Sequence, residues 1–183
     1  EYLKGDRDAM TTAQKRNAIL FYGKLKCSTC HSGPLMTDQK HYNIAAPQFG
    51  IGKDETGLDL GRYLVTGDET DRFKFRVPGL RNVTHSAPYL HNGAFYNLAD
   101  VILHHLDAEK SLLNYDPVAE LIQGSELSDT YVDDPDVLSE LINSSDVRKK
   151  KIKSSEMADL LEFMNALTAP NIGARLESTI PSS

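Results

Sequence analysis

In the stretch Cys27-Ser28-Thr29-Cys30-His31, a histidine directly follows two cysteines that stand three positions apart. In c-type haem attachment, two thiols add to the two vinyl groups of the porphyrin. The adjacent histidine then supplies an axial nitrogen to the iron. The motif therefore predicts one covalent haem c, attached through Cys27 and Cys30, with His31 as the near iron ligand. Gly33-Pro34 follows at once, and we expect a backbone carbonyl there to hold the other ring nitrogen of His31.

Two other kinds of site use the same cysteine spacing. A thioredoxin-like redox pair follows a strand in a βαβ pattern, whereas the residues before Cys27 recur at helical spacing. A structural zinc site requires a second pair of cysteine or histidine ligands at suitable spacing, and the chain has only two cysteines. Both alternatives are therefore disfavoured relative to haem c.

Composition sets the broad class of the protein. A chain of 183 residues that is 40% hydrophobic can bury the core of one domain. No stretch approaches the ~20 consecutive apolar residues that a membrane-spanning helix requires, so no membrane span is predicted. The net charge of −6 argues against a general nucleic-acid binder, because phosphate contacts require an excess of lysine and arginine.

Helix signals predict a mainly α fold with long ordered loops. A capping box at Thr11 and Gln14 begins a helix that runs toward Cys27. Further helices are predicted after the N-cap Asn97, from Asp134-Pro135, and from Ser154 or Ser155 up to Pro170. The ranges 32–71 and 73–97 are rich in glycine and proline and are expected to be loops. Short helical turns are expected within 32–71, with Tyr63-Leu64-Val65 as a candidate short strand. Loops of this length in a compact domain usually wrap a ligand.

The far iron ligand is sought among the remaining histidines and methionines. The predicted helix after Asn97 places Leu98, Val101, Ile102 and His105 on one apolar face. His104 lies about 100° away and is expected to point toward solvent or a partner. This pattern favours His105, with Met36 and His41 as the alternatives.

Several further motifs carry a family resemblance. They are Cys27-Ser28-Thr29-Cys30-His31-Ser32-Gly33-Pro34-Leu35, Gly61-Arg62-Tyr63 with Val65-Thr66-Gly67, Phe75-Arg76-Val77-Pro78-Gly79-Leu80-Arg81-Asn82-Val83, and Ala87-Pro88-Tyr89-Leu90-His91-Asn92-Gly93-Ala94-Phe95. Together they resemble the C-terminal haem domain of the bacterial di-haem cytochrome c peroxidase/MauG family. The resemblance covers about residues 11–106 and 155–168. It implies a cytochrome-c-like haem domain over 11–170 with a variable insertion at about 112–153, between a linker (1–10) and a C-terminal tail (171–183).

The resemblance also implies roles for individual residues. Counted from Gly93, the position of the far iron ligand falls on His105, where the family has methionine or tyrosine. Arg76 and Arg81 are expected to pair with haem propionates or to brace loops by salt bridges. Ser86 and Pro88 are expected to supply backbone carbonyls to a calcium ion.

The family carries two haem signatures, and this chain has one. We therefore expect a second haem domain, either cut from this chain or in a separate chain, where hydrogen peroxide reacts. The domain would relay electrons to or from that second haem in a peroxidase-family oxidoreductase. A stand-alone mono-haem carrier and a MauG-like enzyme that oxidises a partner protein are the alternatives. Haem c attachment implies a periplasmic or extracytoplasmic location. The basic run at residues 148–151 is a candidate surface for a redox partner protein.

Overall fold

The computed structural model describes residues 2–50, 57–121 and 125–169, so the predicted tail at 171–183 lies outside the described residues. The described chain is mainly helical, which confirms the predicted fold class. It divides into two compact units, each built from separate stretches of sequence. Of the described residues, unit 1 comprises 2–38, 78–86 and 153–169, and unit 2 comprises 39–50, 57–77, 87–121 and 125–152.

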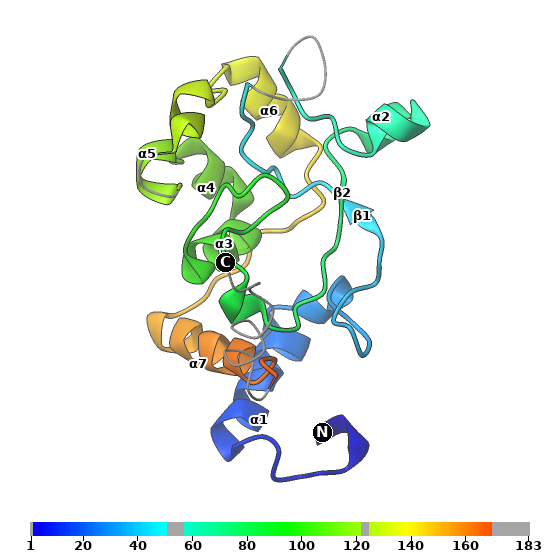
Figure 1. The fold of residues 1–183 in the computed structure, drawn as a ribbon, viewed down its shortest axis with the longest axis vertical. Coiled ribbons are helices and arrows are strands. Elements are labelled where there is room, and N and C mark those ends of the chain that lie inside the picture. Colours follow the sequence, from blue (N-terminus) through cyan, green and yellow to red (C-terminus); the bar gives the residue numbers. More distant parts are fainter. Residues whose placement is uncertain (1, 51–56, 122–124, 170–183) are drawn as a thin grey trace, which may run out of the picture. The chain divides into compact units, whose positions relative to one another are not determined.

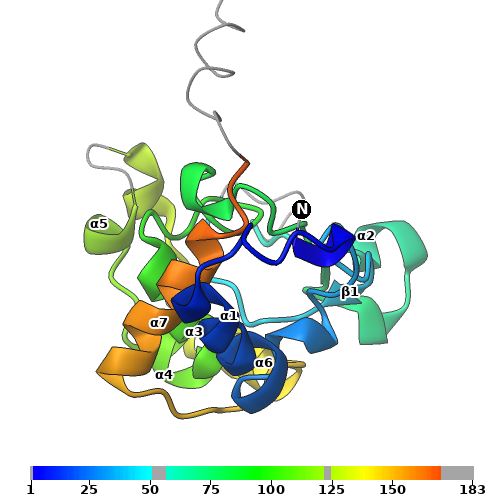
Figure 2. The ribbon, with the colours of Figure 1, turned by 90° about the horizontal axis from the view of Figure 1, so that it is seen from below.

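Unit 1 is built around two helices that lie side by side, α1 (Thr12–Ile19) and α7 (Ser154–Asn165) (Figures 1 and 2). The predicted capping box at Thr11 is present and begins α1, which passes into a π-helical turn (Leu20–Lys24). Phe21 of this turn packs against Phe163 of α7, with the two ring centroids 5.2 Å apart. Short 3-10 turns complete the unit at Tyr2–Lys4, Cys27–Thr29 and Val83–His85.

Unit 2 combines a two-stranded antiparallel sheet with a group of short helices. The strands pair His41 with Arg76, and the helices pack around two apolar clusters, one centred on Phe73 and Leu141 and the other on Phe95 and Tyr115. The elements are β1 (His41–Tyr42), α2 (Tyr63–Thr66), β2 (Phe75–Arg76), α3 (Leu98–Leu106), α4 (Ala108–Leu113), α5 (Pro117–Glu120) and α6 (Pro135–Asn143), with 3-10 turns at Glu69–Asp71 and Glu126–Thr130.

The sequence signals for helix starts are confirmed. Asn97 caps α3 by accepting a hydrogen bond from the Ala99 amide, and Asp134 caps α6 with Pro135 in the first helical position. The predicted strand at Tyr63-Leu64-Val65 is wrong, because these residues form α2. Val65 is 89% exposed. The preference of such residues for strands depends on a neighbouring strand that buries them.

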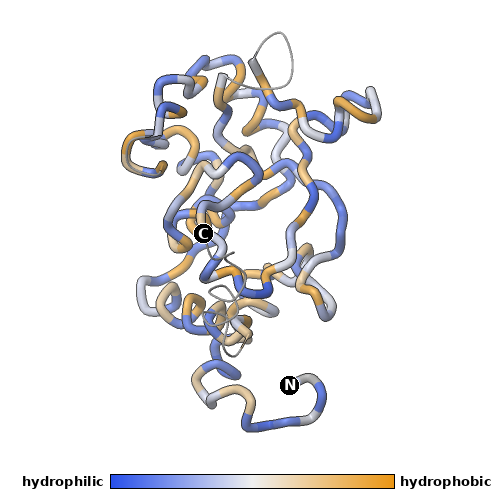
Figure 3. The backbone as a smooth tube through the Cα atoms, in the orientation of Figure 1, coloured by the Kyte–Doolittle hydropathy of each residue, from blue (hydrophilic) through white to orange (hydrophobic). Residues whose placement is uncertain are grey.

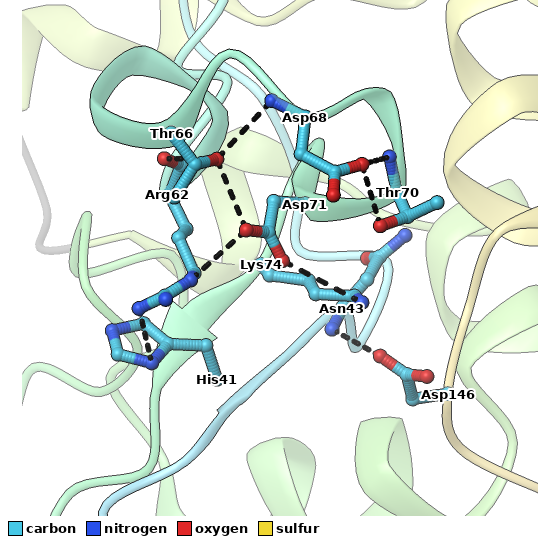
Figure 4. A network of polar contacts seen from close by, with 9 residues as sticks. All are labelled: His41, Asn43, Arg62, Thr66, Asp68, Thr70, Asp71, Lys74 and Asp146. Carbon is cyan, nitrogen blue, oxygen red and sulfur yellow. Dashed lines mark hydrogen bonds and ion pairs between the residues drawn. The ribbon is translucent and has the colours of Figure 1, made fainter.

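A polar network braces α2 against the 3-10 turn that follows it (Figure 4). Arg62 Nε lies 3.0 Å from Asp71 Oδ2, and the Thr66 hydroxyl donates to the same oxygen at 3.0 Å. Arg62 also reaches His41 Nδ1 at 3.4 Å, which links this region to β1. These side chains add to the backbone hydrogen bonds from Arg62 to Lys74 and from Phe73 to Leu60, which also hold this part of unit 2.

Asn43 anchors the segment that follows β1. It is fully buried, and its amide nitrogen donates to the Leu141 carbonyl at 3.2 Å and to Ser144 Oγ at 2.9 Å. Its amide oxygen accepts from the Ala45 backbone N–H at 2.7 Å. Its backbone N–H donates to Asp146 at 2.8 Å (Figure 4). One side chain thus fixes residues 43–45 to the end of α6.

Hydropathy along the described chain changes over short distances (Figure 3). Within the residues described, no helix combines the length and the apolar character that crossing a membrane requires.

Two glycines with positive φ provide a matched test of close packing. A Cβ on Gly61 (φ +60°) would lie 2.5 Å from the Lys74 carbonyl oxygen, whereas a Cβ on Gly67 (φ +66°) would meet no atom within 4 Å. Gly67→Ala should lower the free energy of unfolding by about 1–2 kcal/mol, because only the left-handed backbone opposes it. Gly61→Ala should cost about 1–3 kcal/mol more, because Lys74 must also move. Chemical denaturation measures both, and equal losses would contradict the predicted clash.

The Asn43 anchor provides a second test. Asn43→Ala leaves the buried Ala45 N–H and Leu141 carbonyl without this partner and should lower the free energy of unfolding by roughly 2–4 kcal/mol. Asn143→Ala is the control, because Asn143 is exposed on α6 and bonds only to Ser139 within that helix. It should change stability by less than about 0.5 kcal/mol. Similar losses in the two variants would refute the anchoring role.

Candidate functional site

A single 3-10 turn presents the two cysteines and His31. The backbone N–H groups of Cys30 and His31 both donate to the Cys27 carbonyl, at 3.3 and 3.0 Å. Both cysteines are half-buried, and no disulfide joins them. Unit 1 therefore brings the predicted pair of thiols and the adjacent imidazole together in one turn.

The loop after His31 turns back on that residue and holds its ring. The Asp38 N–H donates to the Cys30 carbonyl at 2.8 Å, which closes the loop. His31 Nδ1 lies 3.2 Å from the carbonyl oxygen of Met36. The expectation that Gly33-Pro34 supplies this carbonyl is therefore wrong. The Gly33 carbonyl instead accepts from the Met36 N–H at 3.0 Å, in the turn that directs the Met36 carbonyl toward the ring.

This contact determines the tautomer of His31. A carbonyl oxygen only accepts, so Nδ1 must carry the hydrogen, and the lone pair of the neutral ring is on Nε2. Histidines that bind metals are commonly held in this way, with one ring N–H donated to a backbone carbonyl. The Met36 side chain is buried, and its sulfur accepts from the Tyr22 hydroxyl at 3.8 Å.

His105 shows the same arrangement within α3. The residue is half-buried, and its Nδ1 lies 2.7 Å from the Val101 carbonyl oxygen, one helical turn earlier. Nδ1 therefore carries the hydrogen, and the lone pair of the neutral ring is on Nε2. Burial lowers the pKa of His105, although the hydrogen bond to Val101 opposes this shift. The ring is thus kept in the neutral form that metals bind.

His104 is fully buried, so the prediction that it points toward solvent or a partner is wrong. Its Nε2 lies 2.8 Å from the Ile44 carbonyl oxygen, and its Nδ1 lies 3.0 Å from Ser111 Oγ. Burial lowers the pKa of His104 to about 3, so the ring is neutral. The prediction failed because it assumed one buried face, whereas a second side of α3 contacts α4 and the Ile44 carbonyl. The capping residue Asp107, just before α4, was the sequence signal for that helix.

The remaining predicted residues lie in different surroundings. Arg76 is exposed and donates to Gln39 Oε1 at 2.8 Å, and Arg81 is exposed as well. Ser86 and Pro88 are exposed, and Ser86 Oγ donates to the Val83 carbonyl at 3.0 Å.

A compact metal centre built from side chains alone does not occur among the described residues. No group of three or more His, Cys, Asp or Glu residues in residues 2–50, 57–121 and 125–169 could hold a metal ion.

Comparison with known proteins gives a consistent set of relatives, although no family model matches the chain. The chain is 37% identical over 124 residues to the cytochrome-c peroxidase IdrP1 of Pseudomonas sp. (strain SCT), which covers 55% of this chain and 33% of that protein. It is 39% identical over 94 residues to the cytochrome c peroxidase Ccp of Escherichia coli (strain K12), covering 51% and 20%. It is 32% identical over 104 residues to the methylamine utilization protein MauG of Methylorubrum extorquens, covering 56% and 27%. The matches thus span about a third or less of these relatives' lengths.

Solved structures show a similar fold. A MauG-like protein associated with microbial copper homeostasis matches with a TM-score of 0.62 and 25% identity, over 93% of this chain and 50% of that chain. The di-haem peroxidase BthA of Burkholderia thailandensis matches with a TM-score of 0.57 and 19% identity, over 97% and 46%, and this likeness concerns the fold alone. Sequence similarity and fold together support the resemblance of this chain to the C-terminal haem domain of bacterial di-haem cytochrome c peroxidases and MauG.

Proposed function

We propose that this chain is the electron-relay domain of a di-haem peroxidase-type oxidoreductase, with one haem c attached through Cys27 and Cys30. His31 and His105 supply the two axial nitrogens. The observation that carries this proposal is the shared geometry of the two histidines. Each donates its Nδ1 hydrogen to a backbone carbonyl, at 3.2 Å for His31 and 2.7 Å for His105, so the lone pair lies on Nε2.

The donor set in unit 1 fits a covalent haem. Two unbridged, half-buried thiols and one imidazole in a single turn are the groups that attachment and near-side ligation require. When bound, the haem supplies a one-electron Fe(III)/Fe(II) couple. The hydrogen bond from His31 to Met36 orients the ring and increases the basicity of Nε2.

The two alternative far ligands are supported less well by their surroundings. The Met36 backbone carbonyl lies on the Nδ1 side of the His31 ring, away from a metal bound at Nε2. The sulfur of the Met36 side chain accepts a hydrogen bond from the Tyr22 hydroxyl. His41 Nδ1 faces the Arg62 guanidinium, which only donates hydrogen bonds. Nδ1 of His41 is therefore an acceptor, and the hydrogen of the neutral ring lies on Nε2, the opposite of what ligation through Nε2 requires.

Ligation by both histidines restricts what this domain can do. If His31 and His105 both hold the iron, neither axial position would be left for hydrogen peroxide. The two residues thus favour electron transfer here, and peroxide reacts at a second haem in another domain or chain. Two imidazole ligands also hold the reduction potential below that of a histidine–methionine pair, because methionine stabilises the reduced iron.

Charged residues and location complete the proposal. Arg76 and Arg81 bind haem propionates. Arg76 uses only one guanidinium nitrogen for its contact with Gln39, so its other N–H groups can donate to a propionate. Ser86 and Pro88 supply carbonyls to a calcium ion.

The basic run at 148–151 attracts a redox partner protein, although Lys149 is paired with Asp107 at 2.7 Å. The domain works outside the bacterial cytoplasm, where haem c is attached.

A MauG-like role is the second candidate, favoured by the 32% identity to MauG and the similar fold of a MauG-like protein. In that case, the oxidising equivalents reach side chains of a partner protein. An assay of the full-length protein with peroxide distinguishes the two. A peroxidase consumes peroxide with a reduced cytochrome as donor, whereas a MauG-like enzyme leaves an oxidised residue in its partner.

Haem attachment is tested by mass. Expressed with a cytochrome c maturation system, the chain should carry the mass of one haem and give the pyridine haemochrome spectrum of haem c. Cys27→Ala combined with Cys30→Ala should abolish the covalent mass increase, because no thiol remains to add to a vinyl group. Ser28→Ala is the control in the same turn and should retain it. A colourless wild-type protein with the bare polypeptide mass would refute the cofactor assignment.

Far-side ligation is tested by low-temperature EPR of the oxidised holoprotein. The wild type should show a low-spin signal from two nitrogen ligands, and His105→Ala should convert it to high-spin iron or a new ligand set. His41→Ala and Met36→Leu should leave the signal unchanged. A wild-type signal that survives in His105→Ala, but not in one of these two variants, would transfer the ligand role to that residue.

A further inference from the structure

We infer that His104 is a positioning residue that sets the orientation of the His105 ring by fixing α3 to two neighbouring segments of unit 2. This inference rests on the proposed role of His105 as an iron ligand. It assigns a specific task to a buried histidine that is not itself a ligand.

Both ring nitrogens of His104 are engaged. The Ile44 carbonyl, 2.8 Å from Nε2, can only accept, so Nε2 carries the hydrogen. In the neutral ring Nδ1 is then an acceptor, and it receives the Ser111 hydroxyl hydrogen at 3.0 Å. The side chain has no exposed surface, so water does not compete with either bond.

The two groups that bind His104 are themselves held in place. Ile44 lies between Asn43, whose side chain is fixed to the end of α6, and Ala45, whose N–H donates to Asn43. Ser111 lies on α4, which Asp107 caps, and Asp107 pairs with Lys149 at 2.7 Å. His104 therefore joins α3 to two segments, the chain at Ile44 and the helix α4, that are themselves held in place by other contacts.

The position of α3 determines the direction of the His105 ring. The 2.7 Å contact between His105 Nδ1 and the Val101 carbonyl lies within α3 and fixes the ring relative to the helix axis. It does not fix the rotation of the helix itself. His104, the preceding residue, supplies that restraint, with its ring 6.3 Å from the His105 ring and nearly perpendicular to it at 87°. Removing the His104 contacts should let α3 rotate and carry Nε2 of His105 with it.

The His104 ring can be replaced by another ring of similar size, so that its hydrogen bonds are lost without leaving a cavity. The Phe95 ring packs against His104 at a centroid distance of 5.2 Å. His104→Phe keeps an aromatic ring in this place but removes both hydrogen bonds. Ser111→Ala removes only the bond at Nδ1. His104→Gln retains an amide N–H that can donate to Ile44.

The experiment compares the low-spin EPR signal of these variants in the haem-loaded full chain. The largest g value depends on the orientation of the axial imidazole planes. His104→Phe should shift that value or split the signal into two species. Ser111→Ala should give a smaller shift, and His104→Gln, which keeps a donor to Ile44, should give a shift no larger than that of Ser111→Ala. Val137→Ala, on α6, is the control for lost stability: it should lower the denaturation midpoint and leave the g values unchanged.

The possible outcomes separate this inference from the proposed function. If His105→Ala abolishes the signal but His104→Phe and Ser111→Ala keep the wild-type g values, the positioning role is overturned and the ligation stands. If Val137→Ala shifts the signal as much as His104→Phe, the role is overturned as well. If the wild type has no bis-nitrogen signal, both proposals fail. Should His104→Phe not fold, Ser111→Ala decides by the same criterion.

Discussion

An imidazole has two nitrogens, and the candidate site depends on which of them carries the hydrogen. Only the nitrogen with a lone pair can bind iron, and the partner of the other nitrogen decides which one that is. In His31 and His105, a backbone carbonyl holds Nδ1, so the lone pair lies on Nε2. In His104, both nitrogens are engaged with Ile44 and Ser111. The same side chain therefore serves as a candidate ligand or as an internal brace, according to its hydrogen-bond partners.

Local chemistry explains what the sequence could predict. A capping side chain bonds to a backbone N–H two or three residues away, so Asn97 and Asp134 mark the helices that follow them. The motif around Cys27 is equally local. The fold class and the unit 1 part of the site could therefore be predicted from short stretches of sequence.

The features that could not be predicted depend on distant partners. The burial of His104 requires Ile44, 60 positions earlier. Residues 63–66 have strand-forming side chains, but no strand lies beside them, so the turn between Gly61 and Gly67 winds them into a helix. The carbonyl that holds His31 comes from Met36 rather than Gly33 or Pro34, because the loop must close before a carbonyl can face the ring. Spacing along the chain contains none of this information.

The proposed ligation by two imidazoles would link the site to the organisation of the whole protein. A domain whose iron binds no peroxide can contribute to peroxide chemistry only by exchanging electrons with a centre that does. The matched relatives are at least about three times as long as the aligned region, which leaves space for such a centre elsewhere in the protein. Because the oxidation state of the iron changes while its ligands stay the same, electron transfer is fastest when those ligands do not move. The anchored segment at Asn43 and the buried His104 both restrain α3, which is the element that carries His105. The rigidity of this region is therefore the property that the proposed relay requires.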